Sequence, residues 1–311
     1  LSYRIWYTCR VARPWDTKNT FSEALIAMKK FDLRTPIIYV LIFIIMVLLI
    51  VLKQQDDQNK ELALKEKIGK VETKEEKRQD KVLPEAPAPT LKGKIGIIID
   101  DFGYRNDEIS DGFLNLDAKL TYAIIPGHTH STSFGEKAVA AGYEVIVHMP
   151  MENTGRTYGE EEFVLMTYMD NETIERRVKN AFLQIPTAIG LNNHQGSKAS
   201  ADQHVMSNIA RVLKEKKLFF IDSRTTGETI AETTMEVFGV PTARRNVFLD
   251  NEDDEEKILE QLMELVERAE KSGAAIGIGH VKLKTLHVLE EEIPKLQKKG
   301  FVFEFVSNML H

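Results

Sequence analysis

Two adjacent carboxylates, Asp100 and Asp101, stand near the end of the stretch "IGIIIDDFG" at residues 95–103. The four isoleucines before them predict a buried strand, so two like charges meet where that strand ends and repel each other. A divalent cation relieves the repulsion by binding one carboxylate, and it leaves the other free to act as a base. The pair therefore predicts a metal ligand beside a general base.

Two histidines can complete such a site. The only cysteine of the chain is Cys9, so a metal must be held by His, Asp and Glu. His148 in "VHMPME" and His194 in "NNHQGS" each end an apolar run, as Asp101 does. Together the three residues would form a His₂Asp set with open positions, which is typical of catalytic zinc sites. We therefore expect a divalent metal, with Zn²⁺ as the favoured ion.

The elements that position these residues begin after Gly93, where short apolar runs alternate with segments of helical periodicity. The predicted strands cover residues 95–100, 120–126, 143–149, 187–192, 218–222, 246–250, 274–280 and 301–306. Strands that alternate with helices indicate a parallel sheet covered by helices. We predict an α/β fold, a deformed (β/α) barrel of seven to eight parallel strands, with an open doubly wound sheet as the alternative.

Both folds gather ligands at the carboxyl ends of their strands. Nearly every predicted strand delivers a polar residue there: Asp100 and Asp101, His128, His148, Asn192, Asn193 and His194, Asp222, Asp250, and His280. So many ionisable groups at one end of an inert sheet would carry an unexplained desolvation cost. The pattern favours a functional site at this rim.

These residues also carry a resemblance to a known family. From Lys94 to the C-terminus the chain resembles the divergent polysaccharide deacetylases, a distant branch of the metal-dependent polysaccharide deacetylases. The shared pieces, in order, are "IIIDDFG", "VHMPME", "GLNNHQGS", "FFIDSRT" and "GIGH". The resemblance implies a deformed (β/α) barrel, a zinc-type metal, and hydrolysis of N-acetyl groups on a polysaccharide substrate.

The resemblance also assigns roles. In the broader family the first Asp of the pair is the base and the second binds metal, which implies Asp100 as base and Asp101 as ligand. Of the family's two metal-binding histidines, spaced four residues apart, the first matches His148, but the second position holds Glu152. Either Glu152 or His194 must then complete the site, and we favour His194 because imidazole suits zinc. The family's late histidine, a general acid, corresponds to His280.

Five further residues are accessory candidates near the predicted rim. Asp222, Arg244 or Arg245 would orient His280 or Asp100 or bind sugar, and Asn193 and Ser197 are candidates for substrate binding. The predicted function is a metal-dependent hydrolase that removes N-acetyl groups from a cell-wall or related polysaccharide. The alternative is a non-catalytic saccharide-binding or cell-envelope scaffold on a degenerate barrel, which the departure at Glu152 keeps open.

The N-terminal third has a different organisation. Residues 1–35 form a basic stub in which Met28 resembles a start site, and residues 36–52 are an uncharged apolar run of transmembrane length. The run lacks a small-residue cleavage site after it, so we favour a membrane anchor over a cleaved signal peptide. Residues 53–92 are a charged and then Pro-rich linker, and 93–311 the catalytic domain. This order predicts a single-pass membrane protein with an extracytoplasmic catalytic domain.

The charge of the chain excludes one class of partner. The net charge is −6, and the basic residues form no stripe, so we expect no nucleic-acid surface. No pattern in the sequence specifies an oligomeric state.

Overall fold

The computed structural model of the chain describes residues 47–48, 52–55, 91–157 and 159–311. Contacts divide the chain into two units, Leu1–Ala86 and Pro87–His311, and all described strands belong to the second unit. The predicted stub 1–35, and most of the predicted anchor 36–52 and linker 53–92, lie outside the described residues. Among the residues that are described, no helix is both long and apolar enough to cross a membrane.

The second unit is built on one parallel sheet of nine strands. Their bounds are β1 Gly93–Phe102, β2 Thr121–Ile124, β3 Glu144–Met151, β4 Gly190–Gln195, β5 Phe219–Asp222, β6 Thr242–Arg244, β7 Val247–Phe248, β8 Ala274–His280 and β9 Phe301–Phe303. Eight of them follow the order β6-β5-β4-β3-β2-β1-β8-β7, and β9 pairs with β1. This is the cyclic order of a (β/α) barrel that is interrupted between β6 and β7, so the sheet is a curled parallel sheet and not a doubly wound one.

One short segment supplies both edges of this interrupted barrel. β6 pairs with β5 at one edge, β7 pairs with β8 at the other, and only Arg245 and Asn246 separate them along the chain. The Asn246 backbone N donates to Ile276 O at 2.8 Å. The sequence patterns predicted a strand at 246–250 and missed β6, because three residues carry too little apolar periodicity to indicate a strand.

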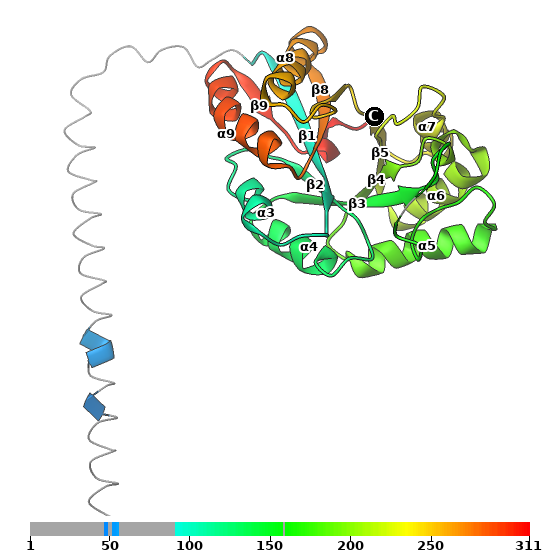
Figure 1. Cartoon of the computed structure of the whole chain (residues 1–311), viewed down its shortest axis with the longest axis horizontal. Coiled ribbons are helices and arrows are strands. Elements are labelled where there is room, and N and C mark those ends of the chain that lie inside the picture. Colours follow the sequence, from blue (N-terminus) through cyan, green and yellow to red (C-terminus); the bar gives the residue numbers. More distant parts are fainter. Residues whose placement is uncertain (1–46, 49–51, 56–90, 158) are drawn as a thin grey trace, which may run out of the picture. The chain divides into compact units, whose positions relative to one another are not determined.

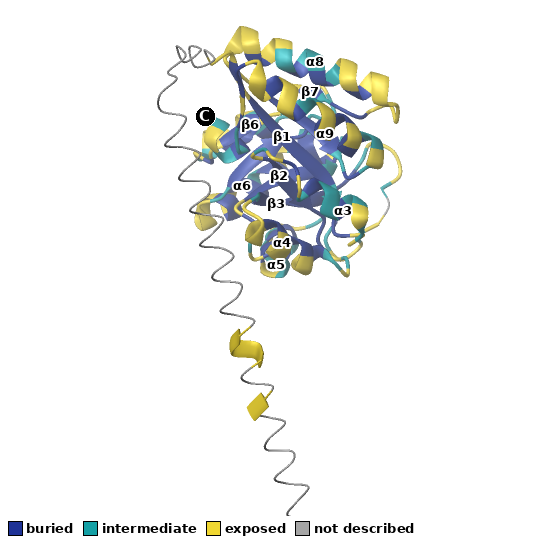
Figure 2. Cartoon of the chain, turned by 90° about the vertical axis from the view of Figure 1, so that its left-hand side faces the viewer, coloured by how far each residue is buried: buried dark blue, intermediate teal, exposed yellow. Residues whose placement is uncertain are grey.

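Helices follow most strands and cover the outside of the sheet, with their exposed faces outward (Figures 1 and 2). Their bounds are α3 Glu108–Phe113, α4 Ser131–Ala140, α5 Asn171–Gln184, α6 Gln203–Lys216, α7 Ala231–Phe238, α8 Glu255–Ser272 and α9 Leu283–Lys298. Four of these helices start at an aspartate whose side chain accepts a backbone N–H of the first turn, for example Asp202 before α6. These caps place the helix starts, and hence the loops between the strand ends and the helices.

The inside of the curled sheet has an apolar floor. A buried cluster there contains residues of six strands, among them Ile98, Ile146 and Ile278, together with Val306 of the C-terminal 3₁₀-helix η3 (Val306–Met309). Gly96 makes room for η3, because a Cβ at that position would lie 2.7 Å from Met309 Sδ. Side chains two residues further along a strand point the same way. The floor therefore supports a layer above it that contains Asp100, His148 and His280.

Candidate active site

The end of β1 departs from regular strand geometry so that both adjacent carboxylates lie within 3.5 Å of His148 Nε2. Neighbouring strand residues normally point to opposite faces. Here Asp101 has φ of 69°, and the register between β1 and β2 shifts between Ile99 and Phe102. A left-handed backbone at a non-glycine residue costs on the order of 1–3 kcal/mol and clusters at functional sites. The kink at Asp101 is thus the local strain that brings Asp100 and Asp101 together.

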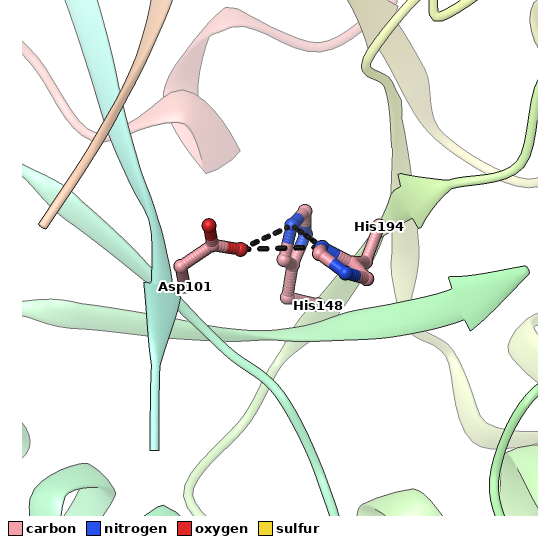
Figure 3. A group of neighbouring side chains, drawn as sticks. All are labelled: Asp101, His148 and His194. Carbon is pink, nitrogen blue, oxygen red and sulfur yellow. Dashed lines mark hydrogen bonds and ion pairs between the residues drawn. The ribbon is translucent and has the colours of Figure 1, made fainter. Parts of the chain in front are cut away.

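Three of the predicted site residues converge on one point above the floor. Asp101 Oδ1 lies 3.4 Å from His148 Nε2 and 3.2 Å from His194 Nδ1, and the two nitrogens are 3.0 Å apart. Figure 3 shows the three side chains directed toward one another. The strands β1, β3 and β4 supply them, and β3 and β4 are hydrogen-bonded neighbours. The structure therefore brings together Asp101, His148 and His194, which the sequence singled out as ligands.

The chemistry of this group fits a divalent cation. One ligand atom from each residue lies within 4.8 Å of the others. Asp101 Oδ1 is buried and has no hydrogen-bond partner among the described residues, although two imidazole nitrogens stand near it. A buried carboxylate oxygen without a hydrogen bond is costly. One oxygen and two imidazole nitrogens are also the donor types that zinc and related ions prefer, so a metal ion would satisfy all three.

Asp100 lies beside the cluster and is deeply buried. Its side chain is 3 % exposed, and its Oδ2 lies 3.5 Å from His148 Nε2. Burial raises the pKa of Asp100, and this outweighs the opposing attraction of His148 and His280. For Asp101, burial also acts to raise the pKa, but the close approach of the His148 and His194 imidazole nitrogens outweighs burial and holds the pKa well below its usual value. The two carboxylates therefore have opposite tendencies: Asp101 stays ionised, and Asp100 takes up protons more readily.

His280 faces the cluster from β8 and is held by a buried carboxylate. Its Nδ1 lies 2.7 Å from Asp250 Oδ1, and its backbone N donates to Asp250 Oδ2 at 2.8 Å. Its Nε2 lies 4.0 Å from Asp101 Oδ2. Burial alone would lower the pKa of His280, but Asp250 outweighs burial and the pKa is raised. The geometry presents a protonatable Nε2 toward Asp101.

Glu152, the alternative ligand, points elsewhere. Its Oε1 pairs with Lys198 Nζ at 2.7 Å, and its Oε2 accepts from the backbone N and the hydroxyl of Thr167 at 2.6 and 2.7 Å. These contacts hold the loops after β3 and β4 together. The carboxylate is outside the group of converging ligand atoms, whereas His194 is inside it.

The accessory candidates mostly hold loops of the rim. Arg244 is exposed, and its Nη1 lies 3.2 Å from Glu232 Oε2 of α7; its role in sugar binding stays a prediction. Arg245 is partly buried, and its guanidinium donates to the carbonyls of Ser223 and Arg224 at 2.7 and 2.9 Å. Asp222 accepts from the Arg224 backbone N at 2.8 Å. These three contacts fix the loop after β5.

Asn193 and Ser197 make similar contacts. Asn193 Oδ1 accepts from the Ser223 backbone N at 2.9 Å, which ties β4 to the loop after β5. Ser197 Oγ accepts from the Thr154 backbone N at 3.0 Å, which ties together the loops after β4 and β3. Both residues lie near His194 in sequence, and both hold the loops that surround it.

Asp250 and Asn192 complete the site. The sequence places both at predicted strand ends but indicates no role for either. Asp250 orients His280, as described above. Asn192 of β4 lies between Asp100 and His148, with its Nδ2 2.8 Å from Asp100 Oδ1 and its Oδ1 2.7 Å from His148 Nδ1. Position at a strand end was the available signal for both. Their partners could not be inferred, because hydrogen bonds between distant strands depend on register.

Comparison with known proteins extends the resemblance seen in the sequence. A profile of the family described as "Divergent polysaccharide deacetylase" matches residues 97–310. An uncharacterized Escherichia coli K12 protein, YibQ, is 34% identical over 209 residues, which are 67% of this chain and 65% of that protein. An uncharacterized protein of Haemophilus influenzae Rd is 33% identical over 205 residues, 66% of this chain and 72% of that protein. The matched segment thus spans slightly less than two thirds of the E. coli relative's length.

A solved structure shares the fold. The crystal structure of an uncharacterized protein from Agrobacterium tumefaciens C58 superposes with a TM-score of 0.67 at 19% sequence identity, and the match covers 73% of this chain and 92% of that one. At this identity the likeness concerns the fold alone.

Proposed function

The chain belongs to the divergent polysaccharide deacetylase family, and on that premise we propose that it is a metal-dependent hydrolase that removes N-acetyl groups from a cell-wall or related polysaccharide. One observation carries the proposal. The ligand atoms of Asp101, His148 and His194 converge on one point, beside the buried carboxylate Asp100 and the oriented imidazole His280. A metal site flanked by a base and an acid is the arrangement that amide hydrolysis needs.

The ligands proposed for the metal are Asp101 Oδ1, His148 Nε2 and His194 Nδ1, with Zn²⁺ as the favoured ion. A divalent ion, when bound there, supplies a Lewis acid that lowers the pKa of water and polarises a carbonyl oxygen. Glu152, which pairs with Lys198 and accepts from the Thr167 backbone N, would supply no further ligand.

The protein's own groups perform the proton transfers. Asp100 accepts a proton from the attacking water, and its raised pKa makes it a stronger base than an ordinary aspartate. His280 donates a proton from Nε2 to the departing amine nitrogen, while Asp250 stabilises its protonated form through Nδ1. The amine leaves as a neutral group because it receives this proton.

The location of the protein in the cell is part of the proposal. We propose that residues 36–52 anchor the chain in a membrane and that the catalytic domain lies outside the cytoplasm, where a cell-wall polysaccharide is accessible. Protease treatment of intact cells tests this topology. Degradation of the domain without lysis is expected, and protection until lysis would contradict it.

The activity itself is tested in two steps. First, the metal content of the purified full chain is measured, and His148→Ala is expected to lose it. Second, acetate release is followed with N-acetylglucosamine oligomers and with peptidoglycan, and Asp100→Asn is the control that keeps the side chain's shape while removing the base. Metal binding without release of acetate from any acetylated sugar would refute the hydrolase proposal and support the non-catalytic saccharide-binding scaffold.

A further inference from the structure

The amide of Asn192 links the proposed base to a proposed metal ligand, inside the barrel. We propose that Asn192 is a positioning residue, which fixes the tautomer of His148 so that Nε2 is free for the metal and which orients Asp100 beside it. The inference rests on the proposed function, because it concerns the same metal site. It adds a residue to which neither the family resemblance nor the sequence patterns assign a role.

The direction of each hydrogen bond follows from one fixed rule. The NH₂ group of Asn192 donates to Asp100 Oδ1 at 2.8 Å, which is the orientation that Asp100 requires in the ionised form that acts as the base, because an ionised carboxylate can only accept hydrogen bonds. The other amide atom, 2.7 Å from His148 Nδ1, is then the carbonyl oxygen, which can only accept. His148 must therefore carry its proton on Nδ1.

A proton on Nδ1 of His148 also determines the state of the other ring nitrogen, Nε2. A neutral histidine with a proton on Nδ1 has a lone pair on Nε2, the atom that faces Asp101 and His194. A group that accepts a hydrogen bond from the other ring N–H commonly fixes the orientation of a metal-bound histidine. In this chain the partner is an amide and not a carboxylate, so it adds no charge beside Asp100.

The position of Asn192 in the fold supports a dedicated role. Asn192 is the register partner of His148 across β3 and β4, and its side chain is fully buried. Ile98 and Ile146 of the apolar floor lie one layer below Asp100 and His148, the two partners of Asn192. A buried amide is tolerated only when it is hydrogen-bonded, because an unpaired polar group in the interior is costly. The two contacts with Asp100 and His148 account for the amide.

Two substitutions separate this role from a merely structural one. Asn192→Leu keeps the approximate volume and removes both hydrogen bonds. Asn192→Asp keeps the acceptor for His148 but places a carboxylate oxygen where the donor to Asp100 was. The matched control is Asn208→Leu, which removes a buried amide of α6 that bonds to Asn171 Oδ1 and His204 O, away from the site.

Two readouts on the full chain are used besides activity. The tautomer of His148 in the metal-free chain is read from long-range ¹H–¹⁵N spectra with ¹⁵N-histidine, assigned by the signals lost in His148→Gln. Zn²⁺ affinity is measured by competition with a chelator. We expect N192L to shift His148 toward the Nε2–H tautomer and to weaken Zn²⁺ binding about 10–100-fold. N192D should keep the Nδ1–H tautomer and bind Zn²⁺ at least as tightly as the wild type, while acetate release falls at least about tenfold.

The outcomes distinguish this inference from the proposed function. N192L that keeps the Nδ1–H tautomer and the wild-type Zn²⁺ affinity overturns the inference, as does N208L that lowers Zn²⁺ affinity as much as N192L. If N192L does not fold, Asn192→Ala removes the amide without adding bulk. The His148 tautomer and the Zn²⁺ affinity of that variant then test the inference in the same way. A wild-type chain that binds Zn²⁺ but releases no acetate refutes the hydrolase proposal alone, because the tautomer and affinity arms still test Asn192.

Discussion

Asp250 ties the proposed acid His280 to the barrel, and Asp250→Asn keeps the shape of this side chain while removing its charge. The carboxylate accepts from the backbone N and Nδ1 of His280 at 2.8 and 2.7 Å and from Thr285 Oγ1 at 2.7 Å. Asparagine can keep the two donors on the Oδ2 side, but its NH₂ group then faces His280 Nδ1. The substitution therefore removes one charge-assisted hydrogen bond and weakens two others.

The structure sets the size of the effect. A hydrogen bond to a charged group contributes about 1.5–3 kcal/mol, so D250N should lower the free energy of unfolding by about 2–3 kcal/mol. For a domain of 150–250 residues, each kcal/mol corresponds to about 2–4 °C in the melting temperature. We therefore expect a decrease of roughly 4–12 °C, measured by calorimetry in the presence of a chelator.

The pH dependence carries the sharper test. The pKa of His280 is raised above 6.5, so its contribution to stability is present below 6.5 and is lost as pH rises through the folded-state value. The pKa of Asp250 is lowered below 3.8, so its contribution is present above 3.8 and is lost on acidification. The difference in unfolding free energy between wild type and D250N should therefore be largest between pH 3.8 and 6.5. In the activity profile, the alkaline limb of D250N should move to lower pH, because His280 loses the charge that keeps it protonated.

Thr285→Val is the matched control, because it removes only the neutral hydroxyl donor to the same carboxylate. We expect it to lower stability and to leave the alkaline limb where it is. A D250N variant whose urea unfolding and pH–rate profile both follow the wild type would refute the assignment of Asp250 as the group that holds His280 protonated.

Three further predictions concern the site and its floor. Because burial raises the pKa of Asp100, its ionisation destabilises the metal-free fold as pH rises above 3.8, so Asp100→Asn should increase the urea midpoint near neutral pH while abolishing acetate release. Glu152→Gln should lower the free energy of unfolding by about 1–2 kcal/mol, measured by urea unfolding, and should keep Zn²⁺ binding. His194→Gln should lose Zn²⁺ binding, and calorimetric titration with Zn²⁺ compares the two variants. Ile278→Ala should lower the free energy of unfolding by about 2–5 kcal/mol, because it opens a cavity in the apolar floor, and urea unfolding measures the loss.

Each of these has a contrary result. A D100N chain that is less stable than the wild type near neutral pH would mean that the buried carboxylate is favoured when charged. Loss of Zn²⁺ binding in E152Q with retention in H194Q would reverse the assignment of the third ligand. An Ile278→Ala change that costs nothing would show that the inside of the sheet is not packed.

Several features of the fold follow from local patterns in the sequence. The run before Asp100 and the run that ends at His148 predicted strands of the sheet, because apolar runs of this length with β-branched residues favour strands. The alternation of strands with helices predicted a parallel, helix-covered sheet. The exception is β6, whose three residues form a strand only because β5 offers a neighbouring edge.

The sequence therefore predicted which residue types lie at the strand ends, because the position of each strand depends on a local pattern of a few residues. Which of those residues meet was decided by the curl and register of the sheet, because these set the distances between strands that are far apart in the chain. Register places Asn192 beside His148, and the kink at Asp101 turns a second carboxylate toward the same histidine. The choice between Glu152 and His194 belongs to the same class: their side chains differ in direction, and only the tertiary structure contains that direction.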